Sequence, residues 1–443
     1  MRPAGAAKRR PTAHCPHGTN TAHCADGLPP RRTNDLRMTT SKPTSTLLGG
    51  LTPDAFMKRY WHKRPLLIRQ AIPGFTAPLS REALFALAAQ DDVESRLVSL
   101  SRKRWQLEHG PFDADDLPPL TRKQWTLLVQ GVNLHADAVD ALMQQFRFIP
   151  DARLDDVMIS YATDGGGVGP HLDLYDVFLL QAHGKRRWRI GPQRDTTWQE
   201  GVPLRILKHF EAEEEWVLEP GDMLYLPPGY AHDGVAEGEC MTYSIGFRAP
   251  LEQEMLQNFL YHLAENAPEL SFSRHFAGRY ADPHQPAVKH PAALPDAMID
   301  TLVSQLEKVR WGQKEVEDFL GRWLSEPKSH VFFDAPDTPL TPARFARAAA
   351  TRGVALSAKS QLLYRRNRYY VNGEPLEVPV NARSTLRRLA DHRTLEASEC
   401  ANFDQNDQEI AEILYDWYAS GWLLLGPDTP IVRKLRTVRK KAG

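Results

Sequence analysis

Residues 156–247 place apolar side chains in short alternating runs, a pattern typical of β-strands. The runs VMISYAT, YDVFLLQA, RRWRIG, EWVLEP, DMLYLP and MTYSIGF are rich in β-branched and aromatic residues. Gly, Pro and Asp separate the runs, and these residues favour turns. Many short strands at this spacing predict a barrel or jelly roll.

Helical patterns flank this region on both sides. Before it, SREALFALAAQ begins with Ser80, which is suited to cap a helix, and carries an apolar stripe. After it, the pattern predicts a winged helix-turn-helix near the C-terminus, whose hairpin QLLYRRNRYYVNGEPLEVP turns at Asn372-Gly373. The predicted strands lie at 98–107 and 125–132, and the predicted helices at 136–146, 251–266, 297–324, 385–393 and 408–420.

These patterns predict an α+β protein with several domains, since 443 residues exceed what one hydrophobic core usually organises. We expect a double-stranded β-helix, a cupin-like jelly roll, over residues 38–249. A helical region would follow at 250–330, and a winged-helix domain at 331–443. Residues 1–37 have almost no large apolar side chain, so we expect a disordered leader or an over-extended start.

Composition narrows the function classes. The 55 basic residues balance 55 acidic ones, so net charge gives no argument for binding nucleic acid, although the basic hairpin and RKLRTVRKK are either an RNA contact or a solvated edge. No apolar run approaches the roughly 18 residues that a membrane span requires. Four scattered cysteines predict no disulfide framework, and we expect a cytoplasmic protein.

The segment GGGVGPHLDLYDVFLL carries the first candidate chemistry. In a strand, residues two apart point to the same side, so His171 and Asp173 would present an imidazole and a carboxylate together. By itself this pair is also compatible with a simple hydrogen bond. If the pair binds a metal ion, the glycines at 165–169 would let the backbone approach that metal and a bulky peptide closely.

A third ligand is expected in EPGDMLYLPPGYAHDG, where a turn, a strand and a rigid bend precede His232. Two histidines and one carboxylate form the facial triad of non-haem Fe(II) oxygenases, which leaves coordination positions open for a cosubstrate and dioxygen. The sequence therefore predicts that His171, Asp173 and His232 bind Fe(II).

An inward-facing cation supports an oxygenase that uses 2-oxoglutarate. If His183-Gly184 is a turn, the returning strand places Arg186 on the apolar face with Trp188 and Ile190. A buried guanidinium needs an anion, either the far carboxylate of 2-oxoglutarate or a protein acid. On the later strand MTYSIGF, Thr242 and Ser244 form a small polar face that either contacts the cosubstrate or lies at the surface.

These motifs resemble those of the JmjC-domain ribosomal oxygenases and of their bacterial members in particular. The resemblance runs from about residue 48 to 425 and rests on YWHKRPLLIRQA, DGGGVGPHLDLYDVFLLQAHGKRRWRIG, EPGDMLYLPPGYAHDG and YSIGFRAP. It implies a dioxygenase with Fe(II) and 2-oxoglutarate, a homodimer formed through the helices after residue 248, and a ribosomal protein as substrate. In bacterial members the target is an arginine β-carbon of large-subunit ribosomal protein sixteen.

Two other functions stay open at this point. One is an N-methyl-lysine demethylase, because hydroxylation of an N-methyl group leads to its loss. The other is a non-oxidative metal-binding cupin whose winged helix binds nucleic acid. A non-oxidative cupin such as an isomerase would not need an inward-facing cation that binds a dicarboxylate, so Arg186 favours the oxygenase.

Overall fold

The computed structural model describes residues 46–266, 278–401, 403 and 408–426 of the chain. All of these residues belong to one compact unit, Thr44–Gly443. The predicted leader at 1–37 and the basic segment at 433–441 lie outside the described residues. No helix in the described part is long and apolar enough to cross a membrane.

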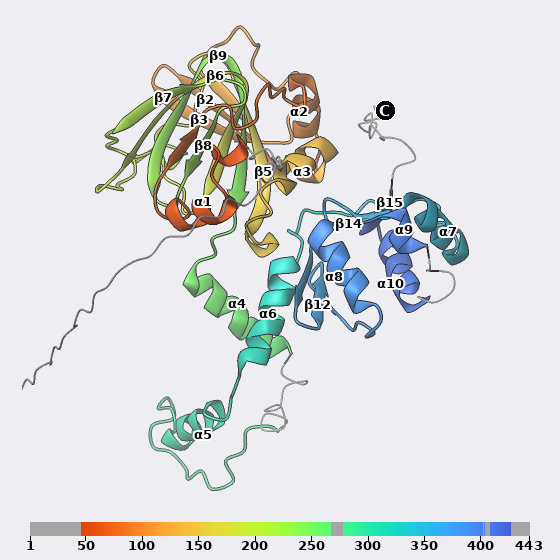
Figure 1. Cartoon of the computed structure of the whole chain (residues 1–443). Coiled ribbons are helices and arrows are strands. Elements are labelled where there is room, and N and C mark those ends of the chain that lie inside the picture. Colours follow the sequence, from red (N-terminus) through yellow and green to blue (C-terminus); the bar gives the residue numbers. More distant parts are fainter. Residues whose placement is uncertain (1–45, 267–277, 402, 404–407, 427–443) are drawn as a thin grey trace, which may run out of the picture. The chain divides into compact units, whose positions relative to one another are not determined.

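In the described residues, the region predicted to be a jelly roll contains a nine-stranded sheet (Figure 1). Its strand order is β1-β8-β6-β9-β5-β4-β2-β3, and β7 pairs with β6. Neighbouring strands pair antiparallel throughout. The bounds are β1 Leu66–Ile68, β2 Ser95–Ser101, β3 Arg104–His109, β4 Trp125–Val129, β5 Leu154–Ala162, β6 Val177–Pro192, β7 Glu214–Leu218, β8 Met223–Leu226 and β9 Tyr230–Phe247.

The two long strands β6 and β9 correct one prediction. The expected turn at His183-Gly184 is wrong, because β6 runs through both residues and pairs with β9 on either side of them. The register shifts around His183, and Gly184 has a φ of 60°. A glycine with positive φ serves a tight turn or a bulge equally well, and here pairing with β9 selects the bulge.

Three helices contribute buried side chains to the same hydrophobic core as the sheet. They are α1 Pro53–Arg59, α2 Arg81–Ala88 and α3 Asp137–Gln144. Ser80 caps α2 as predicted, because its hydroxyl accepts a hydrogen bond from the Ala83 N–H at 3.2 Å. The helices pack against the bulky apolar face of β9, which is fully buried at Tyr243 and Ile245. The small polar face of β9 therefore points to the other side of the sheet.

A second prediction fails at residues 98–107. That segment was expected to be one strand, but β2 and β3 form a hairpin whose turn is Arg102-Lys103. Both turn residues have positive φ, 51° and 65°. Such turns usually contain Asn or Gly, so two basic residues gave no turn signal.

The helical region contains α4 Glu252–Glu265, α5 Asp296–Leu306 and α6 Gln313–Ser325. The predicted single helix at 297–324 is therefore wrong, since it divides between α5 and α6. Glu315 begins α6 by accepting a hydrogen bond from the Gly312 N–H at 2.8 Å, as in a capping box. In Figure 1 α5 lies apart from the sheets, and none of its residues is buried.

The C-terminal residues combine helices with two small sheets, β14-β10-β15 and β11-β12-β13. The predicted turn at Asn372-Gly373 joins β12 to β13, while a second turn at Arg366 joins β11 to β12, so the hairpin is a three-stranded meander. The bounds are α7 Pro342–Arg352, β10 Val354–Leu356, β11 Leu362–Arg365, β12 Arg368–Val371, β13 Glu374–Leu376, α8 Arg383–His392, β14 Thr394–Leu395, α9 Ala397–Cys400, α10 Gln408–Ala419 and β15 Leu423–Leu425.

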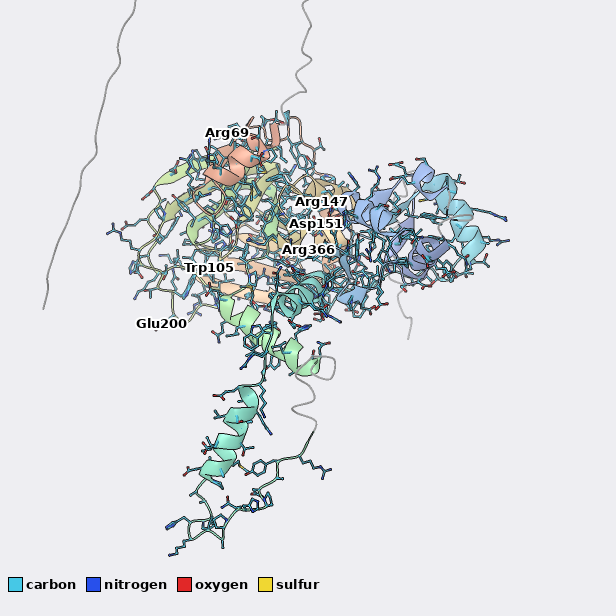
Figure 2. The ribbon with its side chains drawn as sticks, turned by 60° about the horizontal axis from the view of Figure 1, so that its bottom comes forward. Arg69, Trp105, Arg147, Asp151, Glu200 and Arg366 are labelled. Carbon is cyan, nitrogen blue, oxygen red and sulfur yellow. The ribbon has the colours of Figure 1, made fainter. Side chains whose placement is uncertain are left out.

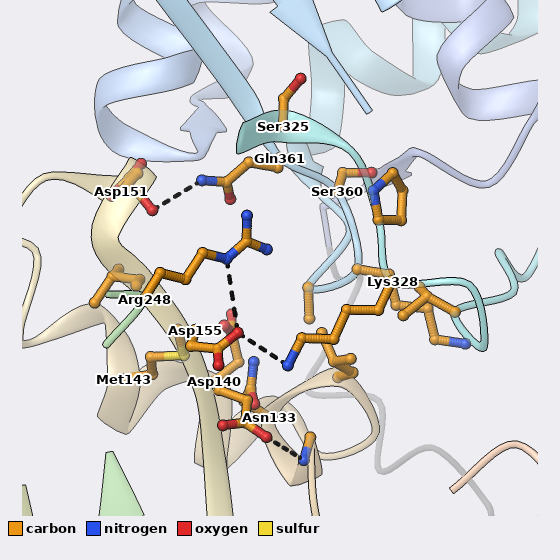
Figure 3. Close-up of a pocket in the computed structure, with 18 of the residues that line it drawn as sticks. Asn133, Asp140, Met143, Asp151, Asp155, Arg248, Ser325, Lys328, Ser360 and Gln361 are labelled. Atoms are coloured by element: carbon orange, nitrogen blue, oxygen red, sulfur yellow. Dashed lines mark hydrogen bonds and ion pairs between the residues drawn. The ribbon is translucent and has the colours of Figure 1, made fainter. Parts of the chain in front are cut away.

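A charged pocket joins this C-terminal region to the sheet (Figure 3). Asp155 forms ion pairs with Lys328 at 2.9 Å and with Arg248 at 3.6 Å. Gln361 donates a hydrogen bond to the Asp151 carbonyl at 3.1 Å. These contacts connect residues of the C-terminal region to residues beside the sheet.

Candidate metal centre

His171, Asp173 and His232 form a compact cluster, and one ligand atom from each lies within 4.8 Å of the others. The Asp173 carboxylate lies 3.9 Å from Nε2 of His171 and 3.7 Å from Nε2 of His232. Among the described residues this is the one group of three or more His, Cys, Asp or Glu side chains that could hold a metal ion. The structure thus brings together the three side chains that the sequence singled out.

The backbone fixes the two histidines opposite each other. We expected His171 to lie in a regular strand, but it forms an isolated bridge with His232 instead. The two N···O distances of this bridge are 3.0 and 2.8 Å. The backbone N–H of Gly229 also donates to the Asp173 carbonyl at 2.6 Å. His232 therefore holds one end of the His-x-Asp segment, and the bend before it holds the other end.

Backbone carbonyls determine which nitrogen of each ring carries the proton. Nδ1 of His171 lies 3.0 Å from the Gly169 carbonyl, and Nδ1 of His232 lies 3.1 Å from the Tyr230 carbonyl. A carbonyl only accepts hydrogen bonds, so each Nδ1 is the donor. When the ring is neutral, Nε2 therefore carries the lone pair and faces Asp173, which is the form of imidazole that binds a metal ion.

His232 is held in its neutral form. It is 2% exposed, and burial, followed by the nearby His171, lowers its pKa to about 4. The Trp188 ring packs 5.8 Å from the His232 ring. A neutral, buried imidazole that packs against an aromatic ring is better suited to bind a metal ion than to transfer protons.

The glycine-rich loop before His171 packs against the sheet. A Cβ on Gly167 would lie 2.6 Å from the Gly234 carbonyl oxygen of β9. The close approach that Gly167 permits in the described structure is therefore to the backbone of β9. The expectation that the glycines at 165–169 let the backbone approach a metal and a bulky peptide stays a prediction.

Arg186 is connected to the cluster through Trp188, because its guanidinium lies 5.6 Å from the Trp188 ring that packs against His232. The Arg186 side chain is 5% exposed, and Trp188 and Ile190 are buried on the same face, as predicted. Nη1 of Arg186 donates to the Ser160 hydroxyl at 3.0 Å and to the Thr242 hydroxyl at 3.3 Å. Its Nε is buried and has no hydrogen-bond partner among the described residues. A buried cation with an unused donor fits a bound anion.

The small polar face of β9 is only partly engaged with Arg186. Thr242 contacts the guanidinium, whereas Ser244 is buried two positions along without a hydrogen bond to Arg186 in the described structure. Its contact with the cosubstrate stays a prediction. Cys240 lies on the same face, where burial raises its thiol pKa and Arg186 acts in the opposite direction.

Sequence reasoning missed Ser160, which contacts Arg186, and Gln181, which contacts Thr242. Ser160 belongs to VMISYAT and Gln181 to YDVFLLQA, where each reads as an ordinary polar position of a strand. Only the pairing of β5 and β6 with β9 brings both side chains opposite Thr242. No local signal in either segment could have identified them.

Comparisons with known proteins agree with this geometry. The JmjC domain matches residues 141–255, and the ROXA-like winged helix matches residues 308–424. The chain is 37% identical over 349 residues to ribosomal protein uL16 3-hydroxylase of Escherichia coli, covering 78% of this chain and 90% of that one. It is 31% identical over 408 residues to a probable ribosomal oxygenase of Haemophilus influenzae, covering 85% and 96%.

Solved structures of the E. coli ribosomal oxygenase YcfD are also similar. One, in complex with cobalt and 2-oxoglutarate, has a TM-score of 0.71 at 34% identity and covers 85% of this chain and 99% of that one. Another, in complex with cobalt and succinic acid, has a TM-score of 0.69 at 34% identity, with the same coverage. The chain therefore belongs to the JmjC-domain ribosomal oxygenase family.

Proposed function

We propose that this protein is an Fe(II)- and 2-oxoglutarate-dependent dioxygenase that hydroxylates a side chain of a ribosomal protein. The observation that carries the proposal is the cluster of His171, Asp173 and His232 beside Arg186, a buried cation with a free donor. His171, Asp173 and His232 would hold Fe(II), and Arg186 with Thr242 and Ser244 would hold 2-oxoglutarate. The 2-oxoglutarate complex of YcfD supports this assignment.

The donor set fits the metal. Two imidazoles and one carboxylate on one face leave positions open for a chelating cosubstrate and dioxygen. Iron and 2-oxoglutarate would together supply the oxidation that places one oxygen atom of dioxygen in the substrate and the other in succinate. The chain's own residues fix the ligand geometry, orient the carboxylate and, through Trp188 and Ile190, keep water from that side of the site.

We propose that the substrate group is an arginine β-carbon of uL16. The name of the E. coli relative, a uL16 3-hydroxylase, supports this choice. The rim of the site suits a polypeptide, because Leu174 and Tyr175, the two residues after Asp173, are 59% and 41% exposed. Along residues 46–250 one other large hydrophobic side chain, Leu120, is similarly exposed. Exposed apolar side chains concentrated at a site commonly mark a binding surface.

Turnover of 2-oxoglutarate tests the proposal. Purified protein with Fe(II), ascorbate and uL16 should release succinate in step with a gain of one oxygen atom on uL16. The His171→Ala variant should release neither product. An exposed histidine away from the site, such as His109, offers a matched control, and His109→Ala should retain full activity. Full activity in His171→Ala would contradict the proposal.

The same assay separates the demethylase alternative. Some relatives are named as bifunctional lysine-specific demethylases and histidyl-hydroxylases, at 24–26% identity. A methyl-lysine peptide should give no formaldehyde and no succinate above background. Formaldehyde release equal to succinate release would favour demethylation instead.

We also propose that the helical region, residues 250–330, forms a homodimer. Large apolar side chains of α5 are 40–56% exposed although they form a helical stripe: Met298, Ile299, Leu302, Val303 and Leu306. On α4, Leu256 and Leu260 are 58% and 51% exposed. Covering such stripes with a second copy would bury them at roughly 25 cal/mol per Å² of apolar surface.

Light scattering after gel filtration tests the dimer. The wild-type protein should have twice the mass of one chain, and Leu302→Glu should shift it toward the monomer. Ser304→Glu adds the same charge at an exposed polar position of α5 and should leave the dimer intact. A monomeric wild-type protein would contradict this part of the proposal.

The location and domain boundaries belong to the same proposal. A cytoplasmic location follows from a ribosomal protein substrate, and imaging of a tagged full-length protein tests it. We propose a catalytic domain at 38–249, the helical region at 250–330 and a winged-helix domain at 331–443. The JmjC match at 141–255 and the winged-helix match at 308–424 support this division.

A further inference from the structure

Gln181 is fully buried at the bend of β6, and its amide can be oriented in one way only. Its Nε2 lies 2.8 Å from the His183 carbonyl and 3.3 Å from the Gly184 carbonyl. Carbonyl oxygens only accept hydrogen bonds, so the NH₂ group must face them. The amide oxygen of Gln181 therefore faces the opposite side, toward Thr242.

The orientation of Gln181 determines the role of the Thr242 hydroxyl. Oγ1 of Thr242 lies 3.0 Å from the Gln181 amide oxygen, which has no proton to give. Thr242 must therefore donate its only proton to Gln181. Its lone pairs are then available to Arg186, whose Nη1 donates to Oγ1 at 3.3 Å. Ser160 behaves in the same way, since its hydroxyl faces the Thr242 carbonyl at 3.5 Å and accepts from Nη1 at 3.0 Å.

The two hydroxyls occupy both protons of Nη1, and neither of them contacts the opposite edge of the guanidinium. That edge carries Nε, which is buried without a partner in the described structure, and Nη2. Two parallel N–H donors on one edge match the two oxygens of a carboxylate. We propose that Gln181 is a positioning residue, which fixes the Thr242 hydroxyl as an acceptor and so aims the Nε edge of Arg186 at the far carboxylate of 2-oxoglutarate. This inference rests on the proposed function.

A purely structural role for Gln181 makes a different prediction. Its two hydrogen bonds to the carbonyls of His183 and Gly184 also stabilise the bend of β6. This stabilising effect would not depend on Thr242. If Gln181 acts through Thr242, removing both side chains should weaken binding no more than removing one. If the two act independently, their effects should multiply.

A double-mutant cycle distinguishes the two roles, with affinity for 2-oxoglutarate as the readout. Calorimetric titration of the Mn(II)-loaded full chain measures binding without turnover. Gln181→Met and Thr242→Val should each weaken binding about fivefold to tenfold, the effect of one lost hydrogen bond. The double variant should be weakened to the same extent as the weaker-binding single variant. Gln193→Met is the matched control, because Gln193 also braces backbone carbonyls, those of Gly191 and Glu211, but does not contact Thr242.

Multiplied effects of about 25-fold or more in the double variant, or unchanged affinity in Gln181→Met, would overturn the inference. If Gln181→Met does not fold, as judged by its melting temperature, Gln181→Asn replaces it in the cycle, because the shorter side chain withdraws the amide from Thr242. Absence of binding to the wild-type protein would instead contradict the proposed function. If the wild-type protein binds 2-oxoglutarate but the effects of the two single substitutions multiply in the double variant, only the proposed role of Gln181 is contradicted.

Discussion

At the residue scale, Arg186 is a buried cation whose hydrogen bonds in the described structure go to the hydroxyl groups of Ser160 and Thr242. Replacing it by Met should weaken binding of 2-oxoglutarate about 100-fold, since a bidentate charged contact contributes roughly 3 kcal/mol. Metal binding should persist, because the proposed ligands His171, Asp173 and His232 would hold the metal without the guanidinium. Calorimetry with 2-oxoglutarate and metal analysis of the same sample check both parts. Loss of metal together with 2-oxoglutarate would indicate a collapsed site.

The site residues differ in how readily they can be predicted from the sequence. His171, Asp173 and His232 stand in motifs whose turns and bends carry a signal of their own. Arg186 could be placed inward by simple alternation along a strand, even though the turn inferred beside it was wrong. Ser160 and Gln181 could not be found, because their roles depend on cross-strand register, and register is set by partners far away in the chain.

At the element scale, Asp222 ties β1 to the strand that leads to His232. Its carboxylate accepts hydrogen bonds from the Gln70 N–H at 2.9 Å and from Nη1 of Arg69 at 2.7 Å. Burial alone would raise the pKa of Asp222, but the backbone N–H groups of Gln70 and Glu219 and the Arg69 guanidinium together lower it. The ionised carboxylate therefore stabilises the folded state.

Asp222→Asn should reduce the free energy of unfolding by about 2 kcal/mol at pH 7, because it removes charge-assisted hydrogen bonds. The folded-state pKa lies below the unfolded value of about 3.9, so the contribution is present above that pH. It should be lost as the pH falls through the folded-state pKa. Urea unfolding of both proteins from pH 7 to pH 3 measures this, and a difference that does not shrink toward acid would contradict it.

The elements that the sequence predicted incorrectly share a physical cause. Local patterns at His183-Gly184 and Arg102-Lys103 do not distinguish a reversal from a bulge or a continuous strand. Pairing with β9 decides the first case and a hairpin between β2 and β3 decides the second. Strands and helices with clear periodicity and caps, such as α2 with Ser80, were predictable because their signals are local.

At the scale of the whole molecule, Arg147 connects the sheet region to the C-terminal helices. Its guanidinium binds Asp151 at 2.7 and 2.5 Å, and Figure 2 labels both residues. It also donates to the carbonyls of Ala390 and Asp391 at 2.8 and 2.7 Å, at the C-terminal end of α8. A cation at that end complements the helix dipole.

Arg147→Ala should therefore destabilise α8 and separate its unfolding from that of the barrel. Scanning calorimetry should show the C-terminal transition at a lower temperature, with about 1–3 kcal/mol lost. Arg344 of α7 is exposed, and Arg344→Ala serves as the control with an unchanged profile. A single unshifted transition in Arg147→Ala would show that Arg147 does not couple the two regions.

Mass spectrometry of intact ribosomal proteins tests the central claim most directly. Ribosomes from cells that contain this protein should carry one additional oxygen atom on an arginine of uL16, and fragmentation should place it on the β-carbon. The modification should be absent from cells that lack the protein and from cells that carry only the His171→Ala variant. Identical uL16 masses in all three would contradict the proposed substrate, and unchanged masses across every ribosomal protein would contradict the hydroxylase itself.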